Sequence, residues 1–173
     1  MKSFRLLFLL ILLVLCFLLP AATLQSVYQN AASGLGYDKL MILESDSVYT
    51  GGISINNQKV AIKGRGALID LAGDRIFVQG QSVLDMDGCV VINGADGILY
   101  QDQSSGLVTQ STFYGNQIGI RFESTGGYLE VYNTILAYNT LYGFASIEGI
   151  SHILHYINAF QNYQGDYVEW CPS

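Results

Sequence analysis

The segment YNTILAYNTLYG, from Tyr132 to Gly143, repeats a phrase found 22 residues earlier as QSTFYGNQIG, from Gln110 to Gly119. Both phrases run from a small polar residue through an apolar pair to Asn, and both reach Gly a few residues later. Self-similarity at a fixed interval of roughly 20 to 50 residues is typical of proteins built from repeated structural units. The interval therefore predicts that the two phrases occupy the same place in successive units.

Three series of short apolar segments recur along the chain in a constant order. The first series is GIS at Gly52, RIFV at Arg75, GILY at Gly97, GIRF at Gly119, GFAS at Gly143 and GDYV at Gly165. The second is KVAIKG at Lys59, VLDMDG at Val83, GLVTQS at Gly106, YLEVYN at Tyr128 and HILHYI at His152. The third is ALID at Ala67, CVVI at Cys89, TFY at Thr112, TIL at Thr134 and NAF at Asn158. Steps of 22 to 24 residues separate the members of each series.

Three short strands per repeat predict a coil of parallel strands, in which successive turns stack ~4.8 Å apart and pair through their backbones. One turn cannot bury its apolar face alone, but stacked turns share a continuous core. Alternation within the segments agrees, since Leu84 and Met86 should point inward while Asp85 and Asp87 point outward.

Asn116, Asn139 and Asn162 stand at equivalent places in three successive repeats. Asparagine tolerates left-handed backbone angles and hydrogen-bonds neighbouring backbone groups, which suits a corner between strands. We expect the three side chains to lie at one corner and to satisfy one another along the coil. The alternative is that each Asn is an isolated turn residue.

The segment DKLMILESDSVYTGGISI, from Asp38 to Ile55, resembles the opening of right-handed parallel β-helices of the pectate-lyase-like superfamily. There a strand leads to a "pGtYtG" motif and the first coil strand; here Glu44, Ser45 and Asp46 replace the usual Pro-Gly. The resemblance implies an all-β, right-handed parallel β-helix of about five turns over residues 51–168. A cap and lead-in strand would occupy residues 27–50, and a short tail residues 169–173.

The first 26 residues have the layout of a secretory signal peptide. Lys2 and Arg5 form a basic start, and Leu6–Leu19 is an uninterrupted apolar run of 14 residues followed by Pro20. The run is short for a membrane span, which takes ~20 residues. We expect a mature chain that is secreted or held at the cell surface, without a membrane span. A retained N-terminal anchor is the alternative.

Without Lys2 and Arg5, the formal net charge of the chain changes from −6 to −8. After Arg75 the only basic side chain is Arg121, against nine carboxylates. Nucleic acids are not expected as partners, because their binding depends on Lys and Arg that neutralise phosphates. Acidic polysaccharides should also be repelled unless Ca²⁺ bridges the two, and we expect no other cofactor.

Cys89 and Cys171 should lie three turns apart, ~14 Å at the strand spacing. A disulfide needs Cα atoms within ~7 Å, so we predict no intrachain bond between them. No Walker loop, HExxH, CxxC or GxSxG motif occurs in the chain, and the motifs that mark polygalacturonases are missing. The sequence therefore offers no established catalytic signature.

Asp85 and Asp87 are the leading candidates for a functional site, because both should face solvent from the second sheet. In neighbouring turns the same sheet should present Lys63, Gln110, Glu130, Tyr132 and Tyr156. Carboxylates beside tyrosines suit sugar hydroxyls and sugar ring faces. We therefore predict that these residues, Lys63 excepted, bind a glycan. The alternative is a solvated face on which Lys63 pairs with Asp87.

Catalysis by the superfamily generally relies on outward-facing carboxylates, with a basic residue that takes the proton in lyases. The catalytic candidates are Asp85, Asp87, Glu130 and Arg121. Arg121 should lie on a different sheet from the aspartates, with only Glu123 as an obvious carboxylate neighbour.

His152 and His155 are three residues apart on one strand, so they should face opposite sides and cannot share a metal ion. We expect His155 to lie in the core, and we predict no metal site. Tyr114 and Tyr138 stand near equivalent corners, where they would either stack on sugar rings or fill the coil.

We expect a non-catalytic protein that binds a polysaccharide or a cell-surface glycan. The first alternative is a polysaccharide lyase or glycoside hydrolase of the same fold. The second is a structural segment, or a fragment of a longer surface protein, that associates with itself through the open ends of the coil, since unpaired strand edges invite pairing.

Overall fold

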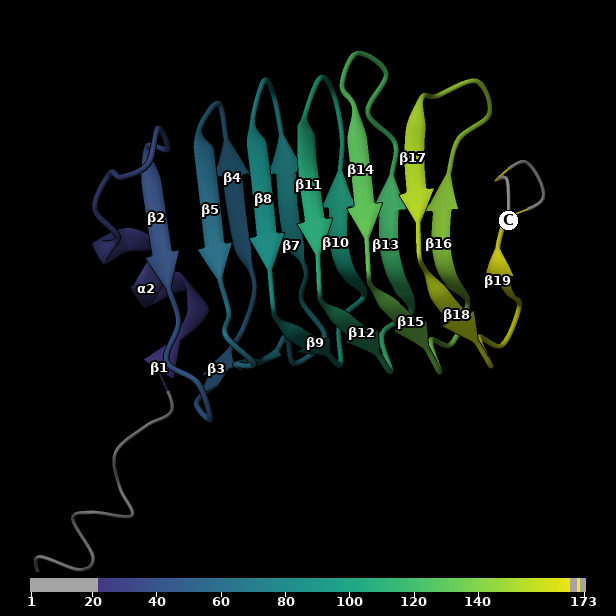
Figure 1. The fold of residues 1–173 in the computed structure, drawn as a ribbon, viewed down its shortest axis with the longest axis horizontal. Coiled ribbons are helices and arrows are strands. Elements are labelled where there is room, and N and C mark those ends of the chain that lie inside the picture. The colour runs from purple at the N-terminus through teal and green to yellow at the C-terminus, as the bar shows by residue number, and fades with distance from the viewer. Residues whose placement is uncertain (1–21, 169–170, 172–173) are drawn as a thin grey trace, which may run out of the picture.

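The computed structural model describes residues 22–168 and 171, and it shows an all-β, right-handed parallel β-helix of about six turns (Figure 1). The predicted signal peptide, apart from residues 22–26, and the predicted tail, apart from Cys171, lie outside the described residues. No helix among the described residues is long and apolar enough to cross a membrane.

Three parallel sheets form the walls of the coil, and they correspond to the three series of the sequence. Sheet 1 contains β4 (Ile53–Asn56), β7 (Ile76–Gln79), β10 (Asp96–Tyr100), β13 (Ile118–Phe122), β16 (Tyr142–Ser146) and β19 (Gly165–Tyr167). Sheet 2 contains β2 (Lys39–Ile42), β5 (Lys59–Lys63), β8 (Val83–Asp87), β11 (Ser105–Thr109), β14 (Leu129–Tyr132) and β17 (His152–His155). Sheet 3 contains β1 (Ala22–Thr23), β3 (Val48–Thr50), β6 (Leu68–Asp70), β9 (Val90–Ile92), β12 (Thr112–Tyr114), β15 (Ile135–Ala137) and β18 (Asn158–Phe160).

The coil has one turn more than the five expected. The additional turn comes from the lead-in segment, because β2 pairs with β5 in sheet 2 and β3 pairs with β6 in sheet 3. Both pairings are parallel and in register with the turns that follow. The lead-in strand of the sequence prediction is therefore the first turn of the coil.

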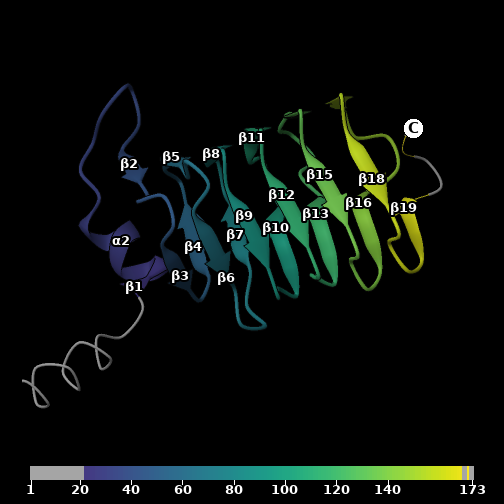
Figure 2. The ribbon, with the colours of Figure 1, turned by 60° about the horizontal axis from the view of Figure 1, so that its bottom comes forward.

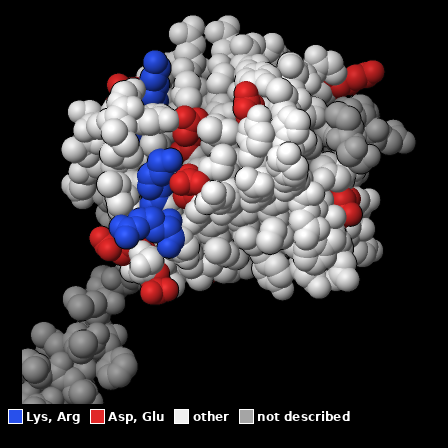
Figure 3. Space-filling model, viewed as in Figure 1, with Lys and Arg blue, Asp and Glu red and all other residues white. Residues whose placement is uncertain are grey.

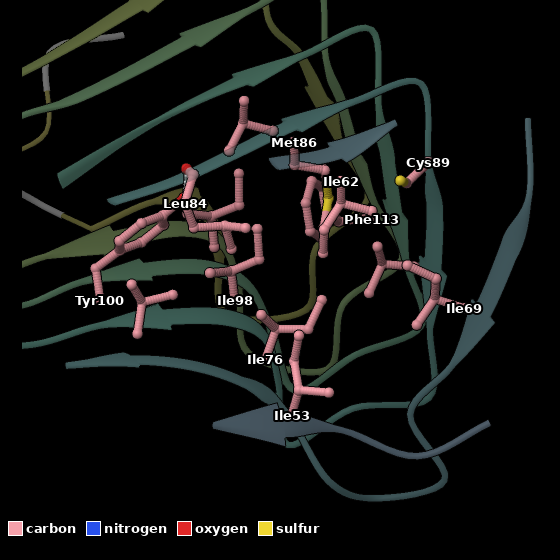
Figure 4. Packing of buried hydrophobic residues seen from close by; sticks show 14 of the residues in the cluster. Ile53, Ile62, Ile69, Ile76, Leu84, Met86, Cys89, Ile98, Tyr100 and Phe113 are labelled. Carbon is pink, nitrogen blue, oxygen red and sulfur yellow. Dashed lines mark hydrogen bonds between the residues drawn. The ribbon is translucent and has the colours of Figure 1, made fainter. Parts of the chain in front are cut away.

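The core is a stack of inward side chains, one layer per turn (Figure 4). Leu84 and Met86 point inward as predicted and are essentially inaccessible to solvent. Ile76 and Ile98 align in sheet 1 and are fully buried, as is Phe113 in sheet 3. Each such side chain stabilises the fold by ~1.5–3 kcal/mol through removal of apolar surface from water.

The corners between sheets are made by residues with left-handed backbone angles, which repeat from turn to turn. The corner from sheet 2 to sheet 3 repeats Arg65, Gly88, Gln110, Asn133 and Tyr156, with φ between 48° and 68°. The corner from sheet 3 to sheet 1 repeats Ala72, Asn93, Gly115, Tyr138 and Gln161, with φ between 51° and 66°. Only some of these corner residues are Gly or Asn. For the others the left-handed conformation costs ~1–2 kcal/mol, and the hydrogen bonds between stacked turns hold them in it.

The three predicted asparagines form a buried ladder. Asn116 Nδ2 donates to Asn139 Oδ1 at 3.3 Å, and Asn139 Nδ2 donates to Asn162 Oδ1 at 2.8 Å. Each Oδ1 also accepts from the backbone N–H of the preceding member, at 3.0 Å in both cases. At the end of the ladder, Asp166 Oδ1 accepts from Asn162 Nδ2 at 2.7 Å. The mutual satisfaction expected from the sequence is confirmed.

The N-terminal end of the coil is closed by helix α2 (Leu24–Asn30), which begins three residues before the expected start of the cap. Thr23 caps the helix by accepting from the backbone N–H of Ser26 at 3.1 Å. Leu24 and Tyr28 are buried in the core, and the helix contacts β1, β2 and β4, the first strands of the three sheets. The helix therefore covers this end of the coil.

The inward side chains of the last turn are less well covered than those before them. Leu154 and Tyr167 are only partly buried, whereas Val131 and Phe144, their counterparts one turn earlier, are fully buried. Within the described part of the chain, the C-terminal end is therefore the more open of the two ends.

Candidate functional site

The outer face of sheet 2 carries most of the side chains predicted to bind a ligand. Asp87 aligns with Lys63 in the preceding turn and with Thr109 in the next, and the same column continues to Tyr132 and His155. Asp85 lies in a parallel column that continues with Leu107, Glu130 and Ile153. The structure therefore brings Asp85, Asp87, Glu130 and Tyr132 onto one face, as expected.

Gln110 and Tyr156 do not lie on the outer face of sheet 2, so the placement predicted for them was wrong. Both residues follow the ends of their strands and occupy the left-handed corner between sheets 2 and 3, with φ of 49° and 56°. The outward positions expected for them are held by Thr109 and His155 instead. Side chains alternate between the two faces of a strand, so an error of one residue in the alignment places each of them on the wrong face. The ends of β11 and β17 were misassigned in this way.

The assignment of the two histidines was reversed for the same reason. They do face opposite sides, but His155 is exposed on the outer face and His152 aligns with buried Leu129. The His152 ring lies 5.0 Å from the Phe144 ring. Burial lowers the pKa of His152 below its usual value, so the imidazole that faces the coil interior is mainly neutral at pH 7.

Asp85 and Asp87 are both held by protein partners. The Tyr37 hydroxyl donates to Asp85 Oδ2, and the backbone N–H of Leu107 donates to Asp85 Oδ1 at 3.0 Å. The hydrogen bond from Tyr37 to Asp85, together with desolvation and the negative charge of Asp85, raises the pKa of Tyr37 to about 12. Asp87 Oδ1 accepts from the Thr109 hydroxyl at 2.7 Å, and Lys63 Nζ lies 3.6 Å from Asp87 Oδ2. The predicted pairing of Lys63 with Asp87 is confirmed.

Further along the face, two tyrosines interact with a single carboxylate, Glu130. The Tyr132 and His155 rings stack with centroids 5.1 Å apart and an angle of 20° between their planes. A hydrogen bond to Glu130 raises the pKa of Tyr132, and partial desolvation together with the charge of Glu130 raises that of Tyr128. Tyr128, Glu130, Tyr132 and His155 are called the aromatic patch below.

The aromatic patch lies on a surface that is poor in positive charge. Figure 3 shows the Lys and Arg side chains of this view gathered over the early turns, while the rest of the face is largely uncharged with scattered acidic groups. No group of three His, Cys, Asp or Glu within residues 22–168 and 171 could hold a metal ion. Two hollows of the surface lie elsewhere, one between α2 and β2 and one beside Arg75 and Phe77.

Arg121 has a carboxylate partner that the sequence did not reveal. Asp96 begins β10, and only 1% of its side chain is exposed. Arg75 Nη1 lies 2.7 Å from Asp96 Oδ2, and Arg121 Nε lies 2.9 Å from Asp96 Oδ1. Glu123 Oε1 adds a longer contact, 3.7 Å from Arg121 Nη1. Arg121 is thus part of an ion cluster on the outer side of sheet 1, with Leu99 and Ala145 as its strand neighbours, as predicted.

Two opposing effects act on the ionisation of Asp96. Burial disfavours the carboxylate and is the larger effect, while Arg121 and Arg75 favour it, and the net result is a pKa above the usual value. The folded chain should therefore take up a proton at a higher pH than the unfolded chain does. Because protonation then favours the folded state, this carboxyl adds stability as the pH falls through its folded pKa.

We expect the free energy of unfolding of the wild type to increase, relative to that of Asp96→Asn, as the pH is lowered from 7 toward the ordinary pKa of Asp. Urea unfolding of both chains at a series of pH values measures this difference, in which the contributions of carboxylates remote from Asp96 cancel. A difference that decreases on acidification would mean that the two arginines outweigh burial.

Cys89 and Cys171 are free and buried, consistent with the prediction that they form no disulfide. Burial, with a smaller effect of Asp87, raises the pKa of Cys89 to about 12, so its thiol stays protonated at neutral pH. Cys171 Sγ lies 3.3 Å from Ser146 Oγ near the C-terminal end of the coil. The Cys89 thiol therefore lacks the thiolate character that a nucleophile needs.

No known protein family matches this chain, and comparisons with curated proteins and with solved structures likewise found no significant match. The likeness to the pectate-lyase-like superfamily therefore stands on the parallel β-helix itself. Since one fold supports many activities, any function has to be argued from the chemistry of the surface.

Proposed function

We propose that this protein acts outside the cell as a glycan-binding β-helix and that it binds an extended, uncharged glycan across the aromatic patch. The observation that carries the proposal is the Tyr132–His155 stack beside the Glu130 carboxylate. Aromatic rings offer apolar surface to the C–H faces of a sugar ring, while phenol and carboxylate groups hydrogen-bond its hydroxyls. The export signal expected from residues 1–26 supplies the extracellular location.

The geometry favours binding over turnover. A glycoside hydrolase needs one carboxyl free to protonate the leaving group and a second free to act as base or nucleophile. Asp85 and Asp87, the leading catalytic pair predicted from the sequence, are engaged by Tyr37, Leu107, Thr109 and Lys63. Glu130 is hydrogen-bonded by tyrosine. These contacts suit carboxylates that shape a surface.

The acidic character of the chain points to an uncharged ligand. Glu130, Asp85 and Asp87 lie on the same face, and Lys63 is already paired. A polyuronate would bring further carboxylates to this face and would be repelled at low salt. Ca²⁺ could offset that repulsion only by bridging ligand and protein, and the proposal does not depend on it.

Binding can be measured with the chain from Ala22 onward, which retains the cap helix, by pull-down on insoluble neutral polysaccharides and by affinity electrophoresis on soluble ones. We expect Tyr132→Ala to weaken binding about tenfold, the effect of one lost aromatic contact. Tyr163→Ala is the matched control, because Tyr163 is highly exposed in the segment between β18 and β19, away from the patch. It should bind like the wild type.

The same incubations should be assayed for new reducing ends and unsaturated products. Released products would contradict a purely binding role and would make Glu130 the first carboxylate to replace. Equal loss of affinity in Tyr132→Ala and Tyr163→Ala would show that the glycan does not use the aromatic patch.

A further inference from the structure

The outer face of sheet 3 differs from that of sheet 2 in its lack of charge. Two columns of side chains project from β9, β12, β15 and β18, and Figure 2 shows these strands side by side. One column is Val90, Thr112, Ile135 and Asn158, and the other is Ile92, Tyr114, Ala137 and Phe160. None of the eight is acidic or basic.

This face is accessible as well as apolar. Ile135 is 39% exposed and Tyr114 50% exposed, and Tyr138 at the adjoining corner is 47% exposed. Tyr138 joins the rings of successive turns into a row, 5.3 Å from the Tyr114 ring and 5.7 Å from the Phe160 ring. The rings therefore lie outside the coil and do not fill it. The eight side chains and Tyr138 are called the apolar face below.

A solvated sheet face normally carries polar side chains, and the outer face of sheet 2 follows that rule with Lys63, Asp87 and Glu130. The apolar face does not follow it over four successive turns. On the outer side of the earlier strand β6, Asp70 is charged, and its Oδ1 accepts from Asn93 Nδ2 at 3.1 Å. An uncharged and largely apolar surface of this kind, with Thr112 and Asn158 as its polar members, suits a contact with another molecule.

We infer that a second copy of this chain covers the apolar face, sheet 3 against sheet 3 about a two-fold axis. The mature chain carries a formal net charge of −8, so two copies repel each other wherever their carboxylates approach. The apolar face is where they can meet without bringing charges together. A two-fold contact uses the same patch on both partners, and an apolar patch is complementary to itself.

The small size of the face is typical of a weak association. The strands from β9 to β18 span ~15 Å at the strand spacing, and three residues along a strand add ~10 Å. Even with the corner rings, each copy would bury only a few hundred Å², less than the ~800 Å² per partner of a stable complex. The dimer is therefore weak and reversible, with a dissociation constant on the order of 10⁻⁴ M.

The inference is independent of the proposed function, because the aromatic patch lies on sheet 2 and the apolar face on sheet 3. It also differs from the end-to-end association considered from the sequence. Helix α2 contacts the first strands of all three sheets, so a head-to-tail stack would have to displace it.

Sedimentation velocity of the chain from Ala22 onward tests the contact, at concentrations from about 10 µM to about 1 mM that bracket the expected dissociation constant. We expect the wild type to shift from monomer to dimer over this range, and more so at high salt, which screens the repulsion. Ile135→Lys should remain monomeric throughout this range, which corresponds to at least a tenfold increase in the dissociation constant of the dimer. This substitution makes the net charge less negative, so general repulsion cannot account for the loss.

Ile42→Lys is the matched control, because Ile42 is 55% exposed but lies on sheet 2. It should dimerise like the wild type, and thermal unfolding should show that both variants are folded. A wild type that stays monomeric at every concentration would overturn the inference. Co-sedimentation of that monomer with neutral phosphatidylcholine vesicles would show that the apolar face binds a lipid surface instead, and would overturn the inference as well. A dimer that persists in Ile135→Lys would overturn it as well.

Discussion

Replacing Asn139 with alanine is expected to lower the free energy of unfolding by about 3–5 kcal/mol. The side chain accepts from the Asn116 backbone N–H at 3.0 Å and donates to Asn162 Oδ1 at 2.8 Å and to the Phe113 carbonyl at 3.3 Å. Only 1% of Asn139 is exposed, so water cannot replace these partners. Each buried group left without a partner costs ~1–3 kcal/mol.

Thermal unfolding followed by circular dichroism measures the effect, with a fall in Tm of roughly 2–4 °C per kcal/mol for a chain of this size. Asn158→Ala is the control, because Asn158 is exposed on β18 and the substitution should change the Tm by no more than 2 °C or so. Asn139→Asp keeps the shape but loses the donor, and it should also destabilise the fold strongly. A small effect of both Asn139 variants would show that the ladder contributes little.

The fold was predictable because its main signals are periodic. Steps of 22 to 24 residues place each apolar segment above its counterpart, and the observed pairings follow them from one turn to the next. The asparagine ladder was predictable for the same reason, since Asn116, Asn139 and Asn162 recur with the period of the turns. Repetition thus fixes which residues are neighbours between turns.

Repetition does not fix where a strand ends and a corner begins. In GLVTQS the corner falls on Gln110, whose left-handed backbone turns its side chain away from the face that Thr109 occupies. The same offset placed Tyr156 on the sheet and His155 in the core. The backbone angles of corner residues depend on the stack of hydrogen bonds between turns, and polar side chains such as Gln do not mark them in the sequence.

The ion cluster around Asp96 was missed because its members do not share a column. Arg121 aligns with Leu99, so a comparison of equivalent positions gives it no carboxylate. The contact forms because Asp96 starts its strand where a long guanidinium from each neighbouring turn can reach it, Arg75 from one side and Arg121 from the other. Such diagonal contacts depend on the length and direction of side chains as well as on the period.

A second large effect is expected at Gly106, which holds an inward position that Leu84 and Leu129 occupy in the adjacent turns. The space of its missing side chain is taken by Tyr100, which is fully buried and donates to the Leu84 carbonyl at 3.1 Å. A Cβ on Gly106 would lie 2.2 Å from the Leu84 carbonyl oxygen and 2.6 Å from the Tyr100 hydroxyl. We expect Gly106→Ala to cost at least about 3 kcal/mol, because backbone of the neighbouring turn would have to move.

Urea unfolding of Gly106→Ala and Gly115→Ala separates close packing from backbone conformation. Gly115 has a φ of +66° but nothing within 4 Å of an added Cβ, and Tyr138 occupies the same corner one turn later with a similar φ. Gly115→Ala should therefore cost only about 1–2 kcal/mol, the cost of the left-handed conformation itself. Adding Tyr100→Phe to Gly106→Ala should recover only part of the loss, since the clash with the Leu84 carbonyl remains. If Gly115→Ala proved the more damaging of the two, left-handed corners would limit the stability of the coil more than the packing between turns does.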